Sequence, residues 1–132
     1  MSENEPERTD PYEFILEYID SVPHLEALML FWNSRPVGWT LEEIASRLYV
    51  PTERVSAILR DLVRLQLVQE ISASLPKFSY LPRSEEQNNL MHRMDEAYRR
   101  DLVRISTMVH SKASSPVREF ARAFRLRKDR DS

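Results

Sequence analysis

Apolar positions between Leu41 and Leu67 recur at helical spacing on both sides of a break at Pro51. Thr40 is a good helix cap, so a first helix is predicted from Leu41. Proline disfavours helix in the residue before it but suits a first turn, so a second helix is predicted from about Pro51. Two helices joined by so short a turn predict a helix-turn-helix. Residues expected to face inward are Leu41, Ile44, Ala45, Leu48, Val55, Ile58, Leu59, Leu62, Val63 and Leu65.

The segments on either side of this motif extend the pattern. Ser21 is predicted to cap an earlier helix that runs to about Asn33 and turns Leu25, Leu28, Met29 and Trp32 inward. After the motif, residues 68–71 and 78–81 are rich in strand-forming side chains and enclose a polar turn, so they predict a hairpin. Trp39 is a candidate for a minimal additional strand. The predicted order is therefore three helices followed by a hairpin.

This order resembles a winged helix, over about residues 22–83. Tyr49 occupies a turn position that usually holds Gly, because that turn often needs a positive φ. The resemblance implies a mainly α fold: a winged helix, with a three-helix core plus a small β-hairpin, and N- and C-terminal helical extensions. It also implies a homodimeric, DNA-binding transcription regulator. The residues that carry the resemblance to MarR-like regulators are Ile44, Ala45, Leu48, Val50, Val55 and Ile58, with LxxLxxLQLV ahead of the hairpin.

In such a regulator the second helix of the motif reads the major groove of double-stranded DNA. The outward residues expected to contact bases or phosphates are Thr52, Arg54, Ser56 and Arg60, and Lys77 and Arg83 would hold the backbone near the wing. Glu53 and Asp61 weaken the positive field on the same surface. The alternative is an ordinary solvated face.

Residues 84–110 are predicted to form one long helix, opened by a capping box of Ser84 and Gln87. Its length of about 40 Å, at ~1.5 Å per residue, exceeds what one small winged helix can cover. A dimer through this helix is therefore expected, and folding back on the N-terminal helix is the alternative. The interface residues would be Met91, Met94, Tyr98, Leu102, Ile105 and Val109, as in the flanking helices of MarR-like dimers.

The two ends of the chain differ in charge. Residues 1–10 are expected to be a disordered lead, and residues 11–21 an amphipathic helix that packs on the core, on a second subunit or on a separate partner. Residues 1–70 carry 13 acidic and 6 basic residues, whereas residues 71–132 carry 8 and 13. Residues 111–132 predict a basic helix and tail, with Arg118, Arg122 and Arg125 on one face. That face suits DNA phosphates, RNA, an acidic partner protein or the acidic half of a dimer mate; the alternatives are a membrane surface or a solvated tail.

No enzyme is predicted from these residues. The sequence has no Cys and one Gly, so thiol catalysis and a glycine-rich phosphate cradle are excluded, and its three His lack metal-ligand spacing. We expect no cofactor, no metal and no membrane association, since no apolar run approaches ~20 residues, and a cytoplasmic location. The leading prediction is a winged-helix DNA-binding regulator. The alternative is a winged-helix protein-interaction module that acts as an adaptor without binding DNA directly.

Overall fold

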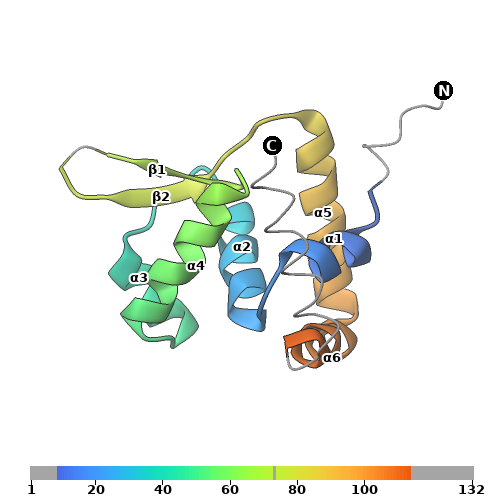
Figure 1. Ribbon diagram of the computed structural model, residues 1–132. Helices are drawn as coiled ribbons and strands as arrows, with labels where there is room; N and C mark the ends of the chain where they lie inside the picture. Colours follow the sequence, from blue (N-terminus) through green and yellow to red (C-terminus); the bar gives the residue numbers. More distant parts are fainter. Residues whose placement is uncertain (1–8, 73, 114–132) are drawn as a thin grey trace, which may run out of the picture.

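Six helices and one antiparallel hairpin make up residues 9–72 and 74–113, the part of the chain that the computed structural model describes (Figure 1). The helices are α1 (Pro11–Tyr18), α2 (Val22–Ser34), α3 (Leu41–Leu48), α4 (Thr52–Arg64), α5 (Glu85–Arg100) and α6 (Leu102–Ala113). The strands are β1 (Val68–Ile71) and β2 (Lys77–Tyr80). Most of the predicted lead lies outside the described residues, as does the segment that holds Arg118, Arg122 and Arg125.

Local sequence signals account for where most helices begin. The side chains of Asp10, Ser21 and Ser84 accept hydrogen bonds from the first-turn backbone of α1, α2 and α5. Thr40 and Glu43 form a reciprocal capping box at the start of α3. The box predicted at Ser84 is only half formed, because the side chain of Gln87 bonds elsewhere.

Helices α2, α3 and α4 and the hairpin form the winged helix, whose wing projects at the left of Figure 1. The strands pair antiparallel, with Val68 opposite Tyr80. Trp39 adds the predicted third strand as a single bridge, exchanging both backbone hydrogen bonds with Phe78 at 2.8 Å. The fold is therefore mainly helical with a small sheet, as predicted from the sequence.

The inward side of this unit matches the pattern expected from the sequence, with one exception. Ile44, Val55, Ile58 and Leu62 are fully or almost fully buried. Val63 is 39% exposed, so its assignment to the core is wrong. It lies next to the end of α4.

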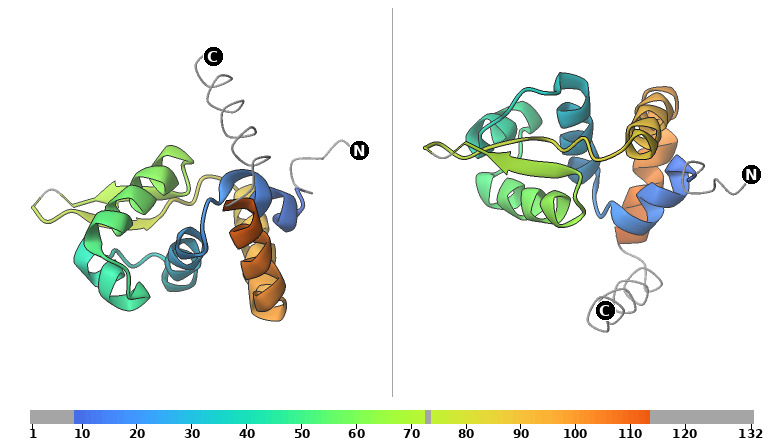
Figure 2. Two further views of the ribbon diagram at one scale, coloured as in Figure 1. Left: turned by 60° about the horizontal axis from the view of Figure 1, so that its bottom comes forward. Right: turned by 90° about the horizontal axis from the view of Figure 1, so that it is seen from above.

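A second group of helices, α1, α5 and α6, packs beside the winged helix, as Figure 2 shows from two sides. Ile15 of α1 and Ile19, the residue that follows this helix, are fully buried, and α1 contacts both α5 and α6. Helix α2 joins the two groups because it contacts α3, α4, β2 and α6. Within one chain, the structure therefore has the arrangement that was the alternative to the dimer: the C-terminal helical region folds back on the N-terminal helix.

The prediction of one long helix over residues 84–110 is wrong. The helix ends at Arg100, and Asp101 leaves helical geometry with φ −122° and ψ 44°. Its carboxylate accepts a hydrogen bond from the hydroxyl of Tyr12 at 2.7 Å, and its carbonyl accepts the first bond of α6 from Ile105 N. The break redirects the chain so that α6 can pack on α1.

Candidate nucleic-acid interface

The turn between α3 and α4 fixes the angle at which the second helix of the motif is presented. Tyr49 ends α3 in the left-handed conformation, at φ 58° and ψ 47°. The positive φ that is usually supplied by Gly is therefore present with a tyrosine. Pro51 then takes the N-cap position of α4, where it supplies no side-chain hydrogen bond. The carbonyl of Pro51 instead accepts hydrogen bonds from the backbone N–H groups of Arg54 and Val55, both at 3.0 Å.

The structure places all four predicted contact residues of the motif on the outer side of α4. Thr52, Arg54 and Arg60 are exposed, and Ser56 is half-buried. Arg54 and Arg60 are six positions apart, which separates them by about 120° around the helix axis. The two arginines therefore lie on opposite flanks of the outer face of α4. Around the helix axis, Thr52 and Ser56 lie between Arg60 and the side that faces the core.

One of the two acidic residues near this face is neutralised by neighbouring groups. Asp61 Oδ2 lies 2.8 Å from Nε2 of His24, and Asp61 Oδ1 accepts a hydrogen bond from Nη2 of Arg64 at 3.0 Å. Glu53 is exposed and has no ion pair within the described part of the chain. The negative charge that opposes an anionic ligand here is therefore mainly that of Glu53.

The wing offers little positive charge. Its exposed tip includes Ser74, Leu75 and Pro76, and Leu75 is 54% exposed. Lys77 begins β2 and is half-buried, with its aliphatic chain close to Gly38: a Cβ added there would lie 3.3 Å from Lys77 Cβ and 2.9 Å from Ile71 Cδ1. Gly38 thus allows the loop before α3 to approach the hairpin closely, and Lys77 is the single cation of the wing among the described residues.

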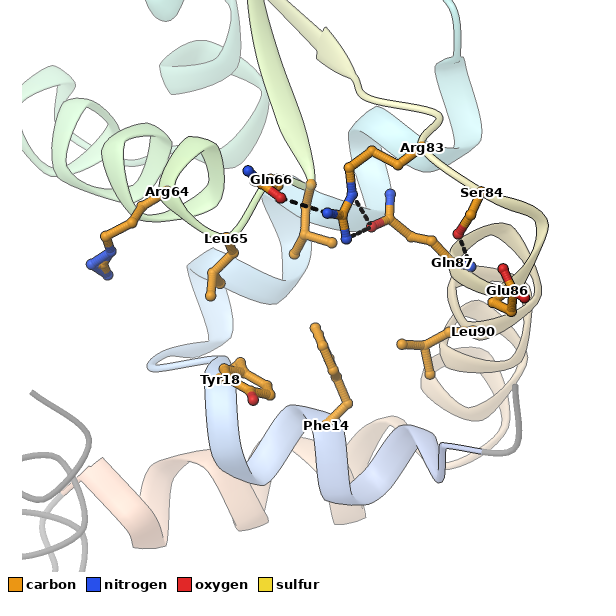
Figure 3. A pocket seen from close by; sticks show the side chains of 11 residues that line it. Phe14, Tyr18, Arg64, Leu65, Gln66, Arg83, Ser84, Glu86, Gln87 and Leu90 are labelled. Atoms are coloured by element: carbon orange, nitrogen blue, oxygen red, sulfur yellow. Dashed lines mark hydrogen bonds between the residues drawn. The ribbon is translucent and has the colours of Figure 1, made fainter. Parts of the chain in front are cut away.

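Arg83 does not belong to the wing tip. Its guanidinium donates to Gln66 Oε1 and, at 2.9 and 3.1 Å, to Gln87 Oε1 (Figure 3). Gln87 is itself buried and donates to the carbonyl of Leu81 and the hydroxyl of Tyr80. The structure therefore directs Arg83 toward the junction of the two helical groups, and sequence spacing alone gave no signal of this.

A cavity of about 420 Å³ opens at this junction. Figure 3 shows Phe14 and Tyr18 from α1 on one side, the end of α4 on another, and the start of α5 opposite them. Its wall combines apolar side chains with the charged groups of Arg64, Arg83 and Glu86. The lining residues are Phe14, Tyr18, Arg64, Leu65, Gln66, Leu67, Arg83, Ser84, Glu86, Gln87 and Leu90.

Most of the residues predicted for a dimer interface are inside the single chain. Met91, Met94 and Ile105 have no exposed surface, and Val109 has 1%. Their assignment to an interface does not fit this conformation, because all four are buried within the single chain, where α1, α5 and α6 pack against one another. Tyr98 is half-buried and Leu102 is 48% exposed. The exposed apolar side chains of the helical group are Leu16, Leu102 and Val103, at 47%, 48% and 79%.

Two titratable groups between α2 and α5 have shifted pKa values. Partial burial raises the pKa of Glu26 above its ordinary value. Burial, and secondly the nearby charge of Glu26, raises the pKa of the Tyr98 phenol. Within residues 9–72 and 74–113, no group of three acidic, His or Cys side chains is arranged to hold a metal ion. Over the same residues, no helix is long and apolar enough to cross a membrane.

No family model matches the sequence, and no curated protein matches it significantly. Two solved structures are similar in fold. MepR, a transcription regulator of the Staphylococcus aureus multidrug efflux pump MepA, has a TM-score of 0.51 at 16% identity, over 98% of this chain and 91% of MepR. Rv1404 from Mycobacterium tuberculosis has a TM-score of 0.51 at 14% identity, over 92% of this chain and 79% of that protein. The resemblance to a winged-helix regulator is thus confirmed at the level of the fold.

Proposed function

We propose that the chain is a homodimeric winged-helix transcription regulator that binds double-stranded DNA through the outer face of α4. The observation that carries this proposal is the presentation of α4. Its start lies exposed at the turn of the motif, and Thr52, Arg54, Ser56 and Arg60 all lie on its outer side. A helix of 13 residues with this exposure fits the major groove of B-DNA, which admits one helix.

Charge on this surface supports an anionic ligand. Arg54 and Arg60 flank the helix face, and pairing with His24 and Arg64 reduces the opposing charge of Asp61. Lys77 adds one cation at the base of the wing. Because these cations are few, we expect modest affinity from one protomer, and a two-fold dimer would double the number of phosphate contacts.

The dimer contact is assigned to the exposed apolar side chains of α1 and α6. Leu16, Leu102 and Val103 are the large apolar residues that the helical group leaves exposed. A symmetric contact through them would place the two copies of α4 on the outside of the dimer, since α3, α4 and the wing lie in the other half of the molecule (Figure 2).

Fluorescence anisotropy tests DNA binding directly. The full chain is titrated onto labelled 30-bp duplexes of random sequence over a salt series, and affinity should fall with rising salt in proportion to the phosphates contacted. Arg54→Ala and Arg60→Ala should each lower affinity about five- to tenfold with unchanged thermal stability. Arg100→Ala, an exposed arginine at the end of α5, is the matched control and should leave affinity unchanged.

Two results would contradict the proposal. Wild-type affinity in both α4 variants would reject this face as the DNA contact. No binding by wild-type protein even at low salt would reject DNA as the ligand and favour the alternative of a protein-interaction module.

A further inference from the structure

Tyr49 supplies the positive φ of the motif turn with a large side chain that the turn does not need for folding. Its side chain is 93% exposed, so it buries almost nothing. Its backbone lies in the left-handed region, which costs conformational free energy for any residue with a Cβ. A glycine at this position would give the same turn at lower cost, so the tyrosine side chain does not contribute to the stability of the turn.

Two other non-glycine residues with positive φ in the described part of the chain show what distinguishes Tyr49. Gln66 and Ser72 also have positive φ, at 62° and 83°. The side chain of Gln66 accepts a hydrogen bond from Arg83, and that of Ser72 accepts one from the backbone N–H of Leu75. The hydroxyl of Tyr49 has no hydrogen-bond partner within residues 9–72 and 74–113. Unlike Gln66 and Ser72, Tyr49 therefore makes no side-chain hydrogen bond within the described part of the chain.

The position of Tyr49 relative to α4 points to a ligand. Tyr49 lies three positions before Thr52, the first residue of α4. Arg47 and Arg54, which are close to it in the sequence, are both exposed. The backbone N–H groups of Tyr49 and Val50 both donate to the carbonyl of Ala45, which fixes the direction of the Cα–Cβ bond of Tyr49. A tyrosine side chain has only two rotatable bonds before its ring and hydroxyl, so it loses little entropy when it makes a contact.

We propose that Tyr49 contacts the sugar–phosphate backbone beside the major groove that α4 enters. The hydroxyl donates a hydrogen bond to a phosphate oxygen, and the ring lies against a deoxyribose. The turn before the recognition helix lies at the edge of that groove, and tyrosine hydroxyls are common donors to phosphates. This inference rests on the proposed function, and it makes Tyr49 a residue that sets the register of α4 on the duplex.

The test compares Tyr49→Gly and Tyr49→Phe with wild type, on random-sequence 30-bp duplexes, because a backbone contact is independent of sequence. Tyr49→Gly should raise the melting temperature by relieving the positive φ and should lower DNA affinity about tenfold. Tyr49→Phe should leave the melting temperature unchanged and lower affinity about threefold by removing only the hydroxyl. If Tyr49 had only a structural role, Tyr49→Gly would not raise the melting temperature and at the same time lower the DNA affinity.

The outcomes separate this inference from the proposed function. Wild-type affinity in both variants, with wild-type protein binding DNA, would overturn the role of Tyr49 alone. No binding by any of the three proteins would overturn both. If Tyr49→Gly lowers the melting temperature because the turn becomes more flexible, the affinity of Tyr49→Phe is the deciding measurement. Wild-type affinity in Tyr49→Phe then overturns the inference.

Discussion

The imidazole of His24 links the start of α2 to the last turn of α4, with Nε2 at 2.8 Å from Oδ2 of Asp61. Its other nitrogen, Nδ1, lies 2.6 Å from Oγ of Ser21, the N-cap of the same helix. The side chain of His24 is only 12% exposed. This pair therefore fixes the position of α4 on the core through a partly buried polar contact.

Removing the carboxylate from this pair should destabilise the fold. Asp61→Ala leaves an imidazole nitrogen of the partly buried His24 without its partner, so we expect a loss of about 1–2 kcal/mol in the free energy of unfolding. Urea denaturation measures this loss. Arg64→Ala is the control, because its pair with Asp61 is exposed and should be worth less than about 0.5 kcal/mol. Equal effects of the two substitutions would contradict a structural role for the His24 contact.

Glu53 should reduce the affinity of α4 for DNA. It is exposed in the first turn of α4, on the face assigned to the groove, where its charge repels phosphates. Glu53→Gln should therefore raise affinity for random-sequence duplexes about two- to threefold at low salt, and the gain should shrink as salt screens the charge. Glu13→Gln makes the same change in the first turn of α1, in the other half of the molecule, and should have no effect. Lower affinity in Glu53→Gln would mean that the carboxylate makes a favourable contact.

Gln87 holds the junction between the two helical groups. Its amide donates to Leu81 O at 2.8 Å and Tyr80 Oη at 3.2 Å, and its oxygen accepts from Arg83. Gln87→Ala removes these bonds at a buried site, so a loss of about 2 kcal/mol in unfolding free energy is expected. Glu86→Ala, at an exposed position on the same turn, is the matched control and should change stability little. A small effect of Gln87→Ala would show that water replaces the amide.

The raised pKa of Glu26 predicts a pH-dependent effect on stability. Since burial makes the folded state bind its proton more tightly than the unfolded state, stability falls as pH rises from 4.5 through the folded pKa. Glu26→Gln should therefore stabilise the protein at pH 7, by about 0.5 kcal/mol after solvent screening, and the gain should vanish below pH 4.5. Thermal melts at both pH values test this expectation. Glu17→Gln, exposed on α1, is the control, and a gain that persists at pH 4 would exclude the carboxylate charge as the cause.

The burial of α6 predicts different results for two neighbouring positions. Val103 is 79% exposed, so Val103→Glu should convert dimers to monomers in light scattering and keep the melting temperature. Ile105 is fully buried, so Ile105→Ala should lower the unfolding free energy by about 2–4 kcal/mol. Dimers that persist in both Val103→Glu and Leu102→Glu would reject the proposed contact.

Much of the winged helix could be predicted from the sequence because its signals are local. Helical spacing, caps such as Thr40, and the break at Pro51 each depend on residues a few positions apart. The break at Asp101 also has a local signal, since Asp is a preferred N-cap residue, but the apolar seven-residue step across it favoured a continuous helix. The contact with Tyr12 that stabilises the break lies 89 positions away in the sequence.

The orientation of individual site residues was harder to predict from the sequence. Spacing placed Thr52, Arg54, Ser56 and Arg60 correctly on the outer side of α4, since period and core side define that face. The direction of Arg83 depends on Gln66 and Gln87, which approach it only after α4 and α5 have packed. The burial of Met91 and Met94 likewise depends on α1, whose partner helix no local pattern identifies.

The contact between Tyr12 and Asp101 also bears on the order in which the chain folds during its synthesis. The winged helix uses residues from α2 to β2, so its contacts are complete before α5 leaves the ribosome. Helix α1 is made first, yet its buried Ile15 and Ile19 pack on α5 and α6, which are made last among the described elements. Because contacts between residues far apart in the sequence form slowly, α1 exposes an apolar face to other nascent chains until α5 and α6 have been made. Among the described helices, the first to be translated is thus one of the last to pack.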